Sequence, residues 1–64
     1  METLTSTELK AIEDQLSSEQ LMIKKFKSYA QTAQDPQIKT VCEQAAALHK
    51  NHFDTLTAHL NAGC

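Results

Sequence analysis

The chain has 64 residues, a formal net charge of −2 and six basic residues, all of them Lys. This balance argues against the clustered positive charge that nucleic-acid binding needs, and no apolar run approaches the roughly 18 residues of a membrane span. The N-terminus lacks the pattern of a secretory signal, so we expect an intracellular protein whose partners are neither nucleic acid nor a membrane.

A first helix is predicted over about residues 5–33. Thr5 is a favourable N-cap residue, and Glu8 three positions later completes a capping box. Residues spaced alternately by three and four then form a heptad-like seam: Leu9, Ile12, Leu16, Glu19, Ile23, Phe26, Ala30 and Ala33. The seam is apolar except at Glu19.

A second helix is predicted over about residues 36–61, after a turn at 34–36. Asp35 suits the N-cap and Pro36 the first helical position, while Gly63 suits a left-handed cap after the helix. The expected seam consists of Ile38, Cys42, Ala45, His49, His52, Leu56 and His59. We expect Cys42 to be buried in this seam and Cys64 to be a free thiol.

The fold class that follows is all-α, with residues 1–64 forming one antiparallel two-helix hairpin. So short a turn makes the second helix return along the first. The apolar stripe on each helix is wider than a two-residue seam, and a chain of this size buries little core alone. We therefore expect a homodimer in which two hairpins form a four-helix bundle.

Ionisable residues interrupt both seams at the same level. If the turn centres near Asp35, the equal rise of two antiparallel helices places Glu19 opposite residue 51, between His49 and His52. One interpretation is a hydrogen-bonded layer that fixes register, and another leaves a histidine at the rim. The third is a site for a divalent transition metal (zinc, nickel or iron) held by Glu19, His49 and His52.

Catalysis is not expected. Di-iron bundles use Glu-x-x-His, whereas Ala46 lies three residues before His49, and His49 three before His52. Cys42 lies two helical turns from His49, about 10.5 Å along the axis, which is too far for a nucleophilic pair. His59 has no acid opposite and is expected near the helix end, partly exposed.

Four segments carry a resemblance to a known family: Leu16–Gln20, Tyr29–Ala30, Asp35–Ile38 and His52–Leu56. Together they resemble the small helical proteins related to spore coat protein F. The resemblance implies a ferritin-like hairpin in which Glu19 takes the place of a ligand glutamate, and a non-enzymatic assembly module associated with sporulation. It also implies the spore coat as a location and other coat proteins as partners. A metal-binding bundle is the alternative function.

Overall fold

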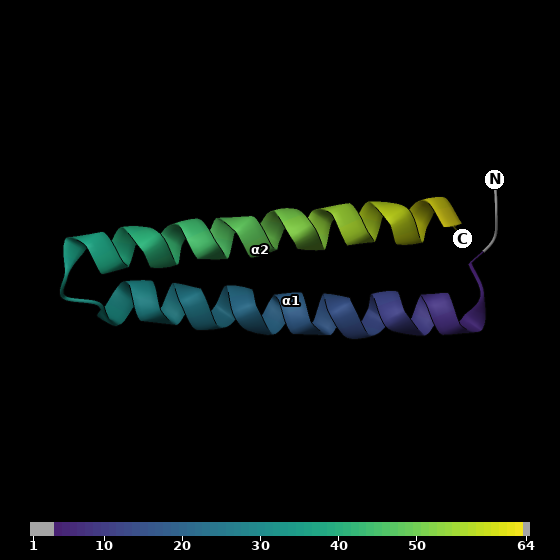
Figure 1. The fold of residues 1–64 in the computed structure, drawn as a ribbon, viewed down its shortest axis with the longest axis horizontal. Coiled ribbons are helices and arrows are strands. Elements are labelled where there is room, and N and C mark those ends of the chain that lie inside the picture. Colours follow the sequence, from purple (N-terminus) through teal and green to yellow (C-terminus); the bar gives the residue numbers. More distant parts are fainter. Residues whose placement is uncertain (1–3, 64) are drawn as a thin grey trace.

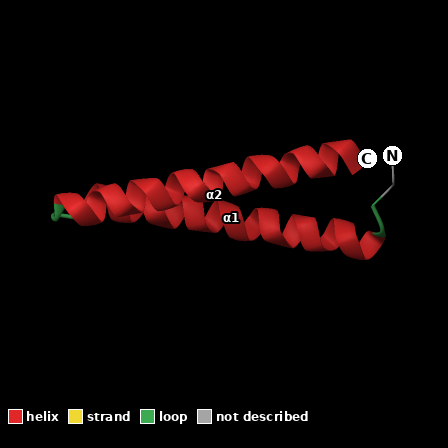
Figure 2. Cartoon of the chain, turned by 45° about the horizontal axis from the view of Figure 1, so that its top comes forward, coloured by secondary structure: helices red, strands yellow, loops and turns green. Residues whose placement is uncertain are grey.

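The protein is a helical hairpin in the computed structural model, which describes residues 4–63. Helix α1 spans Ser6–Thr32 and α2 spans Pro36–Gly63. The helices run antiparallel and side by side (Figure 1), with their axes inclined to one another (Figure 2). The chain measures 47 × 16 × 10 Å along its principal axes, so it is a two-helix layer. Neither helix is long and apolar enough to cross a membrane.

The start of α1 confirms the predicted capping box. The Glu8 N–H donates to Thr5 Oγ1 at 3.1 Å, and the Thr5 N–H donates to Glu8 Oε1 at 2.9 Å. The hydrogen bond from the Thr5 backbone is the main reason why the pKa of Glu8 is lowered. Two N–H groups that have no partner inside the helix are thereby satisfied.

The turn confirms the predicted role of Asp35. Its Oδ1 accepts a hydrogen bond from the Gln37 N–H at 2.8 Å, and its carbonyl oxygen accepts one from the Lys39 N–H at 3.0 Å. Pro36 is the first helical residue, where its missing N–H is not needed. Because only three residues separate the helices, α2 has to fold back along α1.

At its far end α2 runs two residues past the predicted limit. Gly63 is its last helical residue, and no glycine among residues 4–63 has a positive φ. The predicted left-handed cap at Gly63 is therefore wrong. Because Gly63 is itself part of the helix, its backbone does not adopt the left-handed conformation that would end the helix there.

The contact between the helices is narrow. Ala30, Cys42 and Ala46 are the buried apolar residues, exposed by 5–7%, and no described side chain is fully enclosed. The buried position predicted for Cys42 is confirmed, while Cys64 lies outside the described residues. Small side chains on this line let the backbones approach closely, but they leave the larger apolar side chains partly in solvent.

The predicted seam of α2 is confirmed at Cys42, Ala45, His49 and Leu56, which are buried or partly buried, and is wrong at its other three positions. Ile38 is 55% exposed, His59 is exposed and the His52 side chain is half-exposed. Ala46, Phe53 and Leu60, which lie outside the predicted seam, are buried or partly buried as well. Apolar residues flank the seam on both sides, so the sequence pattern alone left the rotation of α2 about its axis open.

Replacing Thr5 with Ala removes the acceptor of the capping box. We expect this variant to lose about 1 kcal/mol in its free energy of unfolding, measured by urea denaturation at fixed protein concentration. Thr7→Ala, at an exposed position in the same first turn, is the matched control and should change stability much less. Equal losses in both variants would contradict the capping role.

The burial of Cys42 can be tested in a Cys64→Ser background, where it is the one remaining thiol. Because only 7% of the residue is exposed, we expect a thiol reagent to modify it far more slowly in buffer than in concentrated urea. Equal rates under the two conditions would show that the interface between α1 and α2 does not cover this side chain.

Candidate metal centre

An acidic residue, Glu19, sits in the contact line between the two helices and is only 5% exposed. A carboxylate removed from water in this way needs hydrogen-bond donors in its place. Gln15, one turn earlier on α1, supplies the first: its Nε2–H donates to Glu19 Oε1 at 3.1 Å. The other oxygen, Oε2, is directed at α2 and contacts both histidines there.

The structure brings the three predicted ligand residues together. His49 Nδ1–H donates to Glu19 Oε2 at 2.9 Å, and His52 Nδ1 lies 3.3 Å from the same oxygen. The prediction that Glu19 lies opposite the histidine pair, which was based on the equal rise of antiparallel helices, is therefore confirmed. The two rings differ in exposure, because the His49 side chain is 22% exposed and that of His52 is 51% exposed.

Aromatic contacts hold the His49 ring. It stacks on Phe26, with ring centroids 5.8 Å apart and planes 8° from parallel. His52 meets the same ring edge-on, with centroids 5.6 Å apart and planes at 89°. Phe26 itself packs edge-on against Tyr29 at 6.1 Å. The orientation of His49 Nδ1 toward the carboxylate is thus fixed by packing as well as by its hydrogen bond.

The hydrogen bond from His49 is the main reason why the pKa of Glu19 is lowered. The hydrogen bond from Gln15 and the charges of His49 and His52 act in the same direction, and desolvation opposes them. Glu19 is therefore a carboxylate at neutral pH, which is the form that a metal ion needs.

The spacing of these groups suits a metal ion. One ligand atom from each of Glu19, His49 and His52 lies within 4.8 Å of the other two, and this is the only such group within residues 4–63. Ligands about 2.1 Å from a tetrahedral zinc ion lie about 3.4 Å apart. The Oε2–Nδ1 separations of 2.9 and 3.3 Å are close to that value. Two imidazoles and a carboxylate form the donor set of many zinc and iron(II) sites.

The centre opens on one side. A hollow of about 290 Å³ next to it is lined by Gln15, Glu19, His52, Thr55 and Leu56. His59 takes no part, because its Nδ1–H donates to the Thr55 carbonyl oxygen of its own helix at 2.9 Å. Sequence reasoning missed Gln15 and Phe26 as supporting residues. The spacing of four between Gln15 and Glu19 was the signal that pointed to that hydrogen bond.

Comparison of the chain with models of protein families, with curated proteins and with solved structures finds no match. The resemblance to proteins related to spore coat protein F therefore stays a prediction.

The lowered pKa of Glu19 gives the stability of the protein a defined pH dependence. Below the ordinary value of 4.5 the unfolded chain takes up a proton that the folded carboxylate resists, so stability is lost as pH falls through the lowered pKa. Above 4.5 this contribution is fully present. We expect Glu19→Gln to have a shallower dependence of unfolding free energy on pH in this acid range, measured by urea denaturation. Parallel curves for the variant and the wild type would contradict the stabilising contact of Glu19 with the histidines.

Proposed function

We propose that this protein is a small non-enzymatic module that binds a divalent transition metal ion through Glu19, His49 and His52. Zinc, nickel and iron(II) are the ions that these donors suit. The observation that carries the proposal is the convergence of Glu19, His49 and His52, of which one ligand atom each lies within 4.8 Å of the other two. Residues from both helices contribute, so a bound ion would join α1 to α2.

His52 favours a metal site over a layer that only fixes register. His49 already provides one donor from α2 to Oε2 of Glu19, at 2.9 Å. His52 is half-exposed and has access to water, yet its Nδ1 also lies 3.3 Å from that oxygen. A layer that only fixes register can form with one imidazole, whereas zinc sites use three or four protein ligands.

Metal binding has to displace the proton that His49 Nδ1 shares with Glu19. The ring either loses that proton to solvent from its charged form or carries it on Nε2, leaving Nδ1 free to ligate. Phe26 keeps the ring in place during this exchange. Because protons compete with the ion for the same nitrogen atoms, the affinity for the ion should fall as pH decreases.

The metal site can be tested by calorimetric titration of zinc, nickel and cobalt into chelator-stripped protein. We expect the wild type to release or absorb heat on binding and to melt at a higher temperature with metal, because the ion binds only the folded state. The His49→Ala, His52→Ala double variant should show neither effect. His59→Ala, which removes a histidine outside the centre, is the matched control and should behave like the wild type.

Two results would contradict a metal site. One is a wild type that neither binds any of the three ions nor melts at a higher temperature in their presence. The other is a double variant that binds as tightly as the wild type, because the ions would then sit elsewhere on the chain.

The second proposed function is an assembly module, in which two hairpins pair as a homodimer to give a ferritin-like four-helix bundle. The observation that favours it is the exposure of Tyr29, Ile38, Val41 and Leu48, each between 46% and 61% exposed. Contiguous exposed apolar side chains of this kind mark a contact surface. The resemblance to proteins related to spore coat protein F supplies the proposed setting: an intracellular protein that joins other coat proteins during sporulation.

Fractionation of sporulating cells tests that setting. An antibody against the protein should detect it in extracted spore coats and not in cells harvested before sporulation begins. Detection only in growing cells would contradict the role in the coat, and it would leave the metal site of Glu19, His49 and His52 to be judged by titration.

A further inference from the structure

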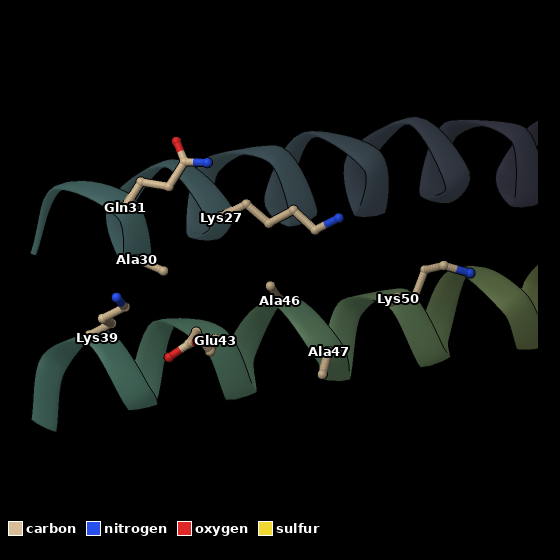
Figure 3. A pocket seen from close by; sticks show the side chains of 8 residues that line it. All are labelled: Lys27, Ala30, Gln31, Lys39, Glu43, Ala46, Ala47 and Lys50. Carbon is tan, nitrogen blue, oxygen red and sulfur yellow. The ribbon is translucent and has the colours of Figure 1, made fainter. Parts of the chain in front are cut away.

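The two flanks of the hairpin differ in chemistry. On one flank a groove of about 470 Å³ has a floor of Ala30, Ala46 and Ala47. Polar and charged side chains from both helices surround that floor (Figure 3): Lys27, Gln31, Lys39, Glu43 and Lys50. We call this side the lysine flank.

The opposite flank carries exposed apolar side chains. Successive residues on a helix are about 100° apart. Val41 and Glu43 therefore lie on opposite sides of the buried Cys42, and Tyr29 and Gln31 lie on opposite sides of the buried Ala30. Because Glu43 and Gln31 both line the lysine flank, Val41 and Tyr29 share the other flank. Ile38 and Leu48 lie three and seven residues from Val41 and join the same stripe.

We call the surface formed by Tyr29, Ile38, Val41 and Leu48 the open face. His52 lies four residues after Leu48 and continues its stripe toward the C-terminus. The hollow beside the metal centre, which His52 lines, is therefore at the edge of the open face. The half-exposed side of the centre and the exposed apolar residues share one flank of the hairpin.

The hairpin exposes more surface to solvent than a compact protein of the same mass, by about the area that one partner buries in an interface. A compact protein of 7.1 kDa exposes about 4,100 Å². This chain exposes 4945 Å², roughly 800 Å² above that scaling, which is about the area that each partner buries in a standard protein interface. The excess follows from the single layer of two helices, which leaves the outward side of each apolar stripe uncovered.

We propose that a second copy of this chain packs on the open face through its own open face and thereby closes the metal centre. This closure rests on the metal site proposed above. A two-fold pairing places identical patches together, and an apolar patch is complementary to itself. The lysine flank is a poor alternative, because its pairing would bring Lys27, Lys39 and Lys50 toward the same residues of the partner.

The pairing has a consequence for the metal ion. His52 and the adjoining hollow are the exposed side of the centre, so a second hairpin on the open face covers the route by which an ion reaches the ligands. The ion is then exchanged only while the hairpins are apart. The rate of exchange should follow the fraction of separated hairpins, which falls as the protein concentration rises.

The pairing itself is tested on chelator-stripped protein by sedimentation. Leu48→Glu places a charge on the open face. Leu21→Glu is the matched control, because Leu21 is 65% exposed but lies two residues, or about 200°, from the buried Glu19 and faces away from α2. We expect dimers for the wild type and Leu21→Glu, and loss of the dimer for Leu48→Glu. A folded monomeric wild type, or a dimeric Leu48→Glu, would overturn the proposal.

A second measurement covers the case in which Leu48→Glu unfolds. In a Cys64→Ser background, Leu48→Cys and Leu21→Cys place a thiol on and off the open face, and Cys42 is buried in both. We expect labelling of the Cys introduced at position 48 to slow as protein concentration rises, while the Cys at position 21 reacts at a constant rate. Constant rates at both positions would overturn the pairing on this face.

Closure of the centre is tested by adding excess EDTA to zinc-loaded protein. We expect the rate of zinc release to fall about tenfold when a rise in concentration reduces the separated fraction about tenfold. A rate independent of concentration would overturn the closure. A wild type that dimerises through the open face but binds no zinc would instead refute the proposed metal site and leave the pairing intact.

Discussion

The carboxylate of Glu19 is the constraint on which the hairpin depends. It occupies the contact line between α1 and α2, where the other buried residues are Ala30, Cys42 and Ala46. A buried charge tolerates few arrangements, because each oxygen needs a donor at hydrogen-bond distance. Sliding α2 by one turn would take His49 out of reach of Oε2. The register of the hairpin and the convergence of Glu19 with the histidines of α2 are thus set by the same contact.

The capping box, the turn and the level of Glu19 could be predicted from local chemistry and from the equal rise of helices. Thr5 and Glu8 form the capping box by contacts over three residues, which depend little on the rest of the fold. Asp35 fixed the turn in the same way. Once the turn is placed, counting back along both helices brings Glu19 to the level of His49 without any knowledge of side-chain packing.

The rotation of α2 was predictable only in part, because the pattern has apolar residues on both sides of its seam. Only packing against α1 decides that Phe53 turns inward and that Val41 and Leu48 stay exposed. The stacking of His49 on Phe26 also depends on that rotation. The same rotation puts His52 at the margin of the centre and next to the open face, so the proposed metal site and the proposed pairing surface meet at this residue.

The most direct measurement is X-ray absorption at the zinc edge of protein loaded with one zinc ion per chain, compared with His52→Ala treated in the same way. We expect a wild-type ion surrounded by nitrogen and oxygen ligands, with the scattering pattern of two imidazoles, and one imidazole fewer in the variant. A first shell containing sulfur, or identical spectra for the two proteins, would show that the ion is held elsewhere than by Glu19, His49 and His52.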